Sequence, residues 1–111
     1  MSNQMIVFDE MACCAIRETF LINQEELAPL KTTVGEENYK ILTDIFKRTV
    51  RMGTILKDIH LRFYYMSIKV ELKRLSLLTS IFKLSCGHTV FEHINALEGL
   101  KNQIGQLTKP N

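Results

Sequence analysis

Apolar side chains recur along most of the chain at the three- and four-residue spacing that is typical of amphipathic helices. In residues 4–22 this spacing connects six apolar positions: Met5, Phe8, Ala12, Ala15, Ile16 and Phe20. Asp9, Arg17 and Glu18 fall on other faces of the same helix. The pattern therefore predicts a first amphipathic helix over residues 4–22.

A proline interrupts the pattern after this helix. Pro29 lacks the backbone N–H that an interior helical position needs, so we expect residues 23–35 to form a connection with at most one short helical turn. Thr33 and Glu36 have the three-residue spacing of a capping box, in which each side chain bonds the backbone N–H of the other. A second helix is therefore expected to begin there.

The longest apolar pattern extends from Leu42 to Leu84. On a helical wheel with about 100° per residue, the apolar positions keep to one face and the basic positions to another over roughly ten turns. Glycine and proline are absent between Gly53 and Gly87. We predict one long central helix with a break near Gly53, because globular domains seldom contain a helix of about 45 residues.

Residues 62–73, and above all the alternating stretch 66–73 within them, also fit a different structure. Their apolar side chains alternate with polar ones, which is typical of a half-buried strand. A strand needs a partner for its backbone groups, and no second segment of comparable strength is present. Helix is therefore the preferred interpretation, and strand stays open as the alternative.

The last part of the chain predicts a turn followed by a helix. Ser85–His88 contains Gly87, which suits a left-handed conformation, and Thr89 and Glu92 have the spacing of another capping box. The helix is expected over residues 90–107. Its inward face comprises His93, Leu97, Leu100, Ile104 and Leu107.

These elements predict an all-α fold: a small antiparallel helical bundle in which the long central helix is flanked by N- and C-terminal helices. The 111 residues suit a single helical domain, 1–111. A hydrophobic content of 46% with 23% charged residues is typical of globular proteins. No apolar run is long enough for a membrane span or a signal peptide, and three cysteines are an odd number for disulfides. We expect a cytoplasmic or nuclear protein.

Charge is unevenly distributed. Residues 1–44 contain eight acidic and three basic side chains, whereas residues 45–84 contain nine basic and two acidic ones. A basic helix face can bind the phosphates of a nucleic acid, and it is equally typical of a solvated surface. Five residues are candidates for a nucleic-acid-binding face: Lys47, Arg51, Arg62, Lys69 and Lys73.

Three potential metal ligands lie close together at the turn. Cys86, His88 and His93 have side chains of the kind that bind zinc, but their spacing matches no familiar zinc finger. A fourth ligand would have to be Cys13, Cys14 or His60. We prefer the interpretation of a capping turn with polar imidazoles, and we predict no metal and no cofactor.

A second apolar stripe on the central helix suggests a function. Leu61, Ile68, Leu72 and Leu75 lie together on the wheel, apart from the main apolar face, at near-heptad spacing. Either the first and last helices flank the central helix and cover both apolar faces, or this stripe is left for a partner. We predict a non-enzymatic protein–protein interaction module that self-associates or docks on another protein through this stripe. Nucleic-acid binding is the alternative, and no membrane contact, small-molecule substrate or catalytic residue is predicted.

Overall fold

The computed structural model describes the chain except for residues 1–3, 8, 45–52, 57 and 109–111. The described part contains helices and one short antiparallel ribbon of two strands, so the predicted all-α helical bundle is confirmed with a small addition. The elements are β1 (Gln4–Val7), α1 (Glu10–Ile22), α2 (Gln24–Val34), α3 (Glu36–Asp44), β2 (Gly53–Leu56), α4 (Asp58–Leu75) and α5 (Val90–Thr108).

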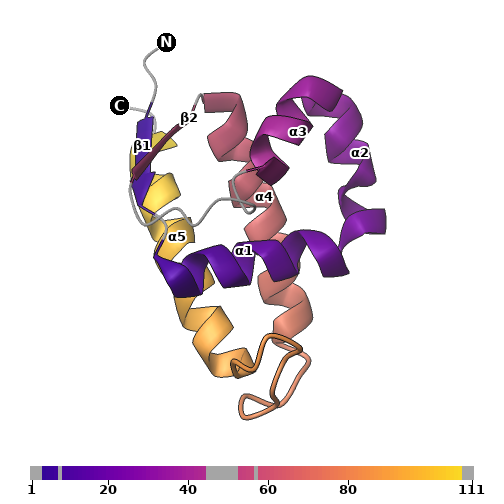
Figure 1. Ribbon diagram of the computed structural model, residues 1–111, viewed down its shortest axis with the longest axis vertical. Helices are drawn as coiled ribbons and strands as arrows, with labels where there is room; N and C mark the ends of the chain where they lie inside the picture. Colours follow the sequence, from indigo (N-terminus) through magenta and orange to yellow (C-terminus); the bar gives the residue numbers. More distant parts are fainter. Residues whose placement is uncertain (1–3, 8, 45–52, 57, 109–111) are drawn as a thin grey trace.

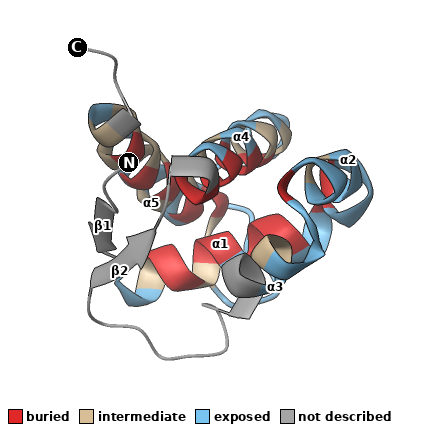
Figure 2. Ribbon diagram, turned by 90° about the horizontal axis from the view of Figure 1, so that it is seen from above, coloured by how far each residue is buried: buried red, intermediate tan, exposed pale blue. Residues whose placement is uncertain are grey.

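Helices α4 and α5 lie side by side and antiparallel, and α1 crosses both of them (Figure 1). The β1–β2 ribbon lies beside α5, whereas α2 and α3 lie on the opposite side, next to α4 (Figure 1). The buried faces of α1, α4 and α5 point toward one another, which places the core between these three helices (Figure 2). The long connection from α4 to α5 extends beyond the end of the helix pair (Figure 1).

Helix α1 begins later than the sequence pattern predicts. Residues 4–7 are paired with residues 53–56 in the ribbon, so the predicted start at residue 4 is wrong. The helix begins after Asp9, whose Oδ1 accepts a hydrogen bond of 2.7 Å from the N–H of Ala12. This N-cap satisfies a backbone donor that the first turn leaves free. The predicted inward face is confirmed from Ala12 onward, because Ala15, Ile16 and Phe20 are also buried.

The expected connection at residues 23–35 is wrong, because this segment forms helix α2 with Pro29 inside it. Proline removes one intrahelical hydrogen bond at a cost of about 3 kcal/mol relative to alanine. Complete burial of Leu27 and near-complete burial of Val34 offset this cost. The capping box between Thr33 and Glu36 is also wrong, since Thr33 lies within α2 and its hydroxyl donates to the carbonyl of Pro29.

The predicted central helix is correct in the middle and wrong at its end. Residues 62–73 lie within α4, so helix and not strand is confirmed there. A break near Gly53 is also confirmed, because Gly53 begins β2. Helix α4 ends at Leu75, however, and residues 76–84 form turns and bends instead of the predicted helical continuation.

Aromatic rings fill the space between α1, α3 and α4. The ring of Phe20 stacks on that of Phe63 with a centroid distance of 5.5 Å, and Tyr64 contacts Phe20 edge-on at 6.0 Å. Tyr39 completes the group against Phe63 at 5.7 Å. Offset-stacked and edge-on pairs of this kind add to the stabilisation that burial supplies. Phe63 and Tyr64 are therefore structural residues of the core.

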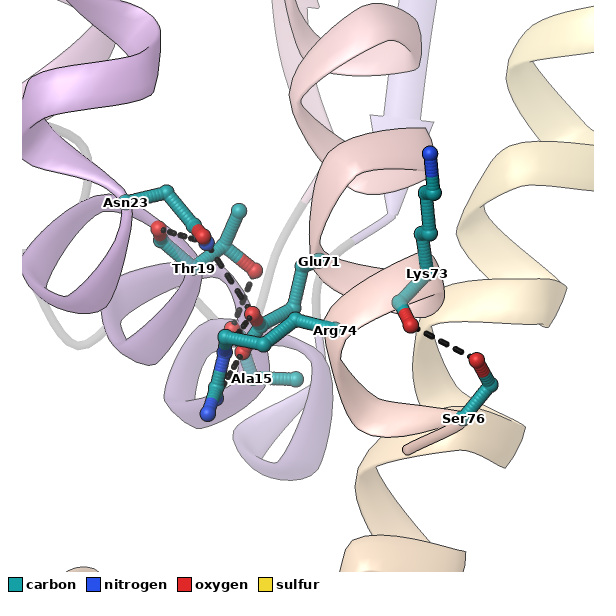
Figure 3. Close-up of polar contacts among 7 residues, drawn as sticks. All are labelled: Ala15, Thr19, Asn23, Glu71, Lys73, Arg74 and Ser76. Atoms are coloured by element: carbon teal, nitrogen blue, oxygen red, sulfur yellow. Dashed lines mark hydrogen bonds and ion pairs between the residues drawn. The ribbon is translucent and has the colours of Figure 1, made fainter. Parts of the chain in front are cut away.

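A buried carboxylate on α4 connects this helix to α1. Glu71 is fully buried and accepts hydrogen bonds from Nε and Nη2 of Arg74 at 2.7 and 2.9 Å (Figure 3). The amide Nδ2 of Asn23 donates to Glu71 Oε1 at 3.0 Å and to the carbonyl of Thr19 at 2.8 Å. The network explains how polar residues occupy the apolar side of the wheel, because a buried charge is tolerated only when it is paired and hydrogen-bonded.

Among the described helices, none combines the length and the apolar character that crossing a membrane requires.

Candidate metal centre

Four metal-ligating side chains from two distant parts of the chain converge at one end of the helix pair. Cys14 comes from α1, Cys86 and His88 come from the connection between α4 and α5, and His93 comes from the first turns of α5. One potential ligand atom of each residue lies within 4.8 Å of all the others. His93 is buried, Cys14 and His88 are half-buried, and Cys86 is exposed, so the cluster is reached from the surface on one side.

The choice between two adjacent cysteines follows from helix geometry. Successive residues in a helix are rotated by about 100°, so Cys13 and Cys14 face different directions. Cys13 is buried in the hydrophobic core, whereas Cys14 faces the connection that carries Cys86. The Asp9 cap fixes where α1 begins and thereby the direction in which the Cys14 thiol points.

A tight turn brings Cys86 and His88 to the start of α5. The N–H of Leu84 donates to the carbonyl of His88 at 2.8 Å, and the N–H of Gly87 donates to the carbonyl of Leu84 at 2.9 Å. Gly87 has φ +90°, a conformation that residues with a Cβ rarely adopt. The turn therefore depends on glycine between the two ligand positions.

The predicted capping box at the start of α5 is confirmed. The N–H of Thr89 donates to Glu92 Oε1 at 3.0 Å, and the N–H of Glu92 donates to Thr89 Oγ1 at 3.2 Å. These two bonds satisfy free backbone donors of the first turn and add to its stability. Because His93 follows Glu92 directly, the cap orders the backbone that carries the His93 side chain.

The distances within the cluster fit a tetrahedral zinc ion. Cys14 Sγ lies 3.5 Å from His88 Nδ1 and 3.8 Å from His93 Nε2. Cys86 Sγ lies 3.4 and 3.2 Å from the same two nitrogens. Zinc bonds of about 2.3 Å to sulfur and about 2.0–2.1 Å to nitrogen give a sulfur–nitrogen edge of about 3.6 Å in a regular tetrahedron. The four sulfur–nitrogen distances are close to this value, and the two remaining ligand-atom pairs lie within 4.8 Å.

Hydrogen bonds alone do not account for four such contacts. Each of the two ring nitrogens faces both sulfur atoms. If the nitrogens accept, the donors are the two thiols, and each thiol has one proton to donate. If the nitrogens donate, each of the two ring nitrogens has one proton to donate. Two protons serve two of the four contacts, whereas one cation between the ligands serves all of them.

The electrostatics of the cluster keep both the Cys14 thiol and the His93 imidazole neutral in the absence of a metal. Burial, and then the neighbouring Cys86 thiol, raise the pKa of Cys14 to about 12. A divalent cation reverses this effect, because it deprotonates a coordinating thiol. Burial, and then the proximity of His88, lower the pKa of His93 and keep its imidazole neutral, which is the form that binds metals.

The ring of His93 has no other polar role among the described residues. Its Nε2 contacts the two sulfur atoms, and its Nδ1 is buried without a hydrogen-bond partner in the described part of the chain. His60 differs, since its Nε2 lies 3.1 Å from Asn38 Oδ1 on α3, away from the cluster. Zinc-ligating histidines usually donate their other ring N–H to a hydrogen-bond acceptor, and the described residues supply no such acceptor for Nδ1.

The sequence identified three of the four side chains and named Cys14 among the possible fourth ligands. It did not distinguish Cys14 from Cys13 or His60. Cys14 and Cys86 are 72 residues apart, and no metal-ligand motif connects positions so far apart in the sequence. The capping turn that the sequence predicts is present, and the crossing of α1 over α5 adds Cys14 to it.

The predicted docking stripe lies inside the protein. Leu61, Ile68 and Leu75 have no exposed surface, and Leu72 is half-buried against the core. The alternative in which the helices leave the stripe uncovered is wrong, because α1, α2 and α5 all pack on α4. In this conformation the stripe offers a partner almost no accessible surface.

The predicted basic face is described only in part. Lys47 and Arg51 lie outside the described residues. Arg62, Lys69 and Lys73 are all exposed on α4, and their spacing places them along one line of the helix. The ammonium of Lys69 lies 5.8 Å from the centre of the Tyr65 ring. Phe63 and Tyr64 are buried, so they are not free to stack on bases.

Comparison of the chain with family models, curated proteins and solved structures finds no match.

Proposed function

We propose that the protein is a non-enzymatic protein-interaction module whose α4–α5 connection is held in place by a structural zinc ion. Four residues bind the ion: Cys14, Cys86, His88 and His93. The observation that carries the zinc site is the set of four sulfur–nitrogen distances between 3.2 and 3.8 Å, with each nitrogen facing both sulfurs. The interaction role is supported by the exposed apolar side chains of the connection, Leu77 and Ile81 above all. Two thiolates and two imidazoles form the tetrahedral ligand set that is typical of zinc.

The number of ligands supports a structural and not a catalytic ion. Catalytic zinc sites use three protein ligands and keep the fourth position for water or substrate, whereas structural sites are closed by four. The four ligands of this cluster would complete the coordination shell. A non-enzymatic role is therefore the function that we propose for the site.

The position of the ion gives it a mechanical role. Cys14 lies on α1, whereas the other three ligands surround the start of α5 and the turn before it. One ion would join α1 to the connection and would stop that connection from extending α4. Because zinc binds thiolates, the protein is expected to act in a compartment where cysteines stay reduced. We therefore propose a cytoplasmic or nuclear location.

Metal content in paired cysteine variants tests this proposal. The full chain, expressed with zinc in the medium and desalted, is expected to contain one zinc ion per molecule by atomic emission spectroscopy. Cys14→Ser removes one of two sulfur ligands and is expected to lower retained zinc to below about one tenth, since ligand loss weakens structural sites strongly.

The adjacent cysteine provides a matched control. Cys13→Ser changes the same atom one position earlier, where the side chain faces the core and not the cluster. We expect it to keep full zinc content with a lower melting temperature. Equal zinc loss in both variants, or no zinc in the wild-type protein, would show that the proposed site is wrong.

A second proposal, nucleic-acid binding, rests on the exposed line of Arg62, Lys69 and Lys73. Each phosphate contact makes binding weaker as salt increases, so three contacts are expected to give a slope near +3 when log Kd is plotted against log salt concentration. A titration with a duplex oligonucleotide between 50 and about 300 mM salt measures this slope. Absence of binding at the lowest salt concentration would eliminate the proposal.

A further inference from the structure

The connection between α4 and α5 exposes large apolar side chains that the bundle does not cover. Leu77 is 83% exposed, Ile81 79%, Phe91 57%, Phe82 54% and Leu78 37%. We name these five residues the apolar loop surface. Among the described residues, the other large apolar side chains with such exposure are Leu21, Ile22 and Met66, which lie on α1 and α4.

Backbone hydrogen bonds hold the apolar loop surface together. The N–H of Val90 donates to the carbonyl of Phe82 at 2.9 Å, and the N–H of Phe91 donates to the carbonyl of Ser80 at 3.0 Å. The N–H of Phe82 donates to the carbonyl of Thr79 at 3.0 Å. Phe91 is thereby fixed beside residues 80–82. A surface that is already ordered loses little conformational entropy when it binds a partner.

The area of this surface is that of a protein interface. Its five side chains expose roughly 500 Å² of apolar surface, at the upper end of what monomers tolerate. A standard interface buries about 800 Å² on each partner, of which about 55–65% is apolar. The apolar loop surface therefore supplies the apolar share of one side of such an interface.

Charges at its border make the surface complementary to itself. Lys83 follows Phe82 and Glu92 follows Phe91, and both side chains are exposed. Neither forms an ion pair within the described part of the chain, although Glu92 accepts hydrogen bonds from Thr89. A two-fold axis that passes midway between these two side chains would set Lys83 of each copy against Glu92 of the other, which is the reciprocal contact of an isologous interface.

We infer that the apolar loop surface is the contact site for a second copy of this chain, which forms a two-fold dimer through residues 77–92. The inference rests on the proposed interaction module and names its partner. It does not require that the ion be zinc, since the exposed side chains and the charge pair belong to the chain itself.

Sedimentation velocity of the full chain, from about 5 to about 500 µM, tests the inference within the range of weak dimers. The wild-type protein is expected to shift from monomer to dimer mass as concentration rises. Leu77→Gln combined with Ile81→Gln is expected to raise the dimer dissociation constant at least about 100-fold, because two exposed apolar contacts are lost. Zinc content and melting temperature should not change.

Two further variants make the result specific. Leu21→Gln combined with Met66→Gln removes exposed apolar side chains from other surfaces and is expected to leave the dimer unchanged. Lys83→Glu is expected to weaken the dimer about tenfold, because it sets two acidic side chains against each other, whereas Lys83→Arg keeps the charge and should leave the dimer unchanged.

A wild-type protein that stays monomeric at the highest concentration would overturn the inference. So would a dimer that the Leu77→Gln, Ile81→Gln pair leaves intact. A monomer that sediments with vesicles of phosphatidylcholine and phosphatidylserine would assign the surface to a bilayer instead. Zinc analysis of the same samples separates the proposals: a zinc-loaded monomer contradicts only the dimer, and a zinc-free dimer contradicts only the metal site.

Discussion

Helix α4 and the segment 76–84 that follows it are both rich in leucine, isoleucine and phenylalanine. In α4 the leucines and Ile68 are buried or half-buried, and the helix packs against α1, α2 and α5. In the following segment Leu77 and Ile81 are more than three quarters exposed, and the backbone makes turns. Similar side chains in neighbouring segments thus have opposite environments.

The difference shows that helical spacing of apolar residues is insufficient to form a buried helix. A helix needs neighbours that cover its apolar face, since most helical stability in proteins comes from tertiary packing. Beyond Leu75 the chain instead turns back toward Cys14, and the backbone bonds of Leu84 and Val90 hold it there. Convergence of the four candidate ligands gives a physical reason for the end of α4.

The largest expected difference is between a charge placed in the buried helix α4 and the same charge placed in the exposed segment 76–84. Ile68→Glu puts an unpaired carboxylate into the core and is expected to cost about 5 kcal/mol or more, enough to unfold most of the protein. Ile81→Glu makes the same change at an exposed position and is expected to alter stability by less than about 0.5 kcal/mol. Urea unfolding followed by circular dichroism compares the two. Similar losses in both variants would contradict the contrast between the segments.

Removal of the ion is expected to have the next largest effect. At free zinc about 1,000-fold above Kd, binding adds about 4 kcal/mol to the folded state, so chelation should lower the melting temperature by at least about 10 °C. Hydrogen exchange should locate the change: the amides of Leu84 and Val90 lose protection first, whereas Ile68 keeps it longer. Equal loss of protection in both segments would mean that the ion does not specifically hold the connection.

The buried carboxylate of α4 offers a third contrast. Glu71→Ala leaves the Arg74 guanidinium and the Asn23 amide without their partner and is expected to cost about 3 kcal/mol. Lys73→Ala, on the exposed side of the same turn, should cost less than about 0.5 kcal/mol. Thermal unfolding of both variants measures the difference, and a neutral Glu71→Ala would show that the network does not stabilise the bundle.

Two glycines provide the smallest and most specific comparison. Gly87→Ala meets no atom within 4 Å, so its expected cost of about 1 kcal/mol comes only from the positive φ of the turn. Gly99→Ala in α5 also has open space and should stabilise the protein by up to about 1 kcal/mol. Opposite signs in a melting experiment are expected. A stabilising Gly87→Ala would mean that the turn adopts another conformation.

The local elements could be predicted where packing follows local pattern. Ala15, Ile16 and Phe20 on α1, and Leu97, Leu100 and Ile104 on α5, are buried as their spacing indicates. The Thr89–Glu92 cap could also be predicted, because both partners lie within one turn.

The features that could not be predicted depend on contacts between distant segments. No local signal in the sequence indicates that residues 4–7 pair with residues 53–56. Pro29 lies inside α2 because the burial of Leu27 outweighs the unfavourable effect of proline in a helix interior. Cys14 approaches Cys86 only through the path of α1 across α5. Neither spacing nor composition encodes that path, so the fourth ligand could be named only as one of three candidates.

X-ray absorption spectroscopy at the zinc edge of the purified full chain tests the central claim most directly. The expected first shell contains two sulfur atoms at about 2.3 Å and two nitrogen atoms at about 2.0–2.1 Å, with no water oxygen. In Cys14→Ser any remaining zinc should have a single sulfur neighbour. A wild-type shell of six oxygen or nitrogen atoms, or one without sulfur, would contradict a zinc ion held by Cys14, Cys86, His88 and His93.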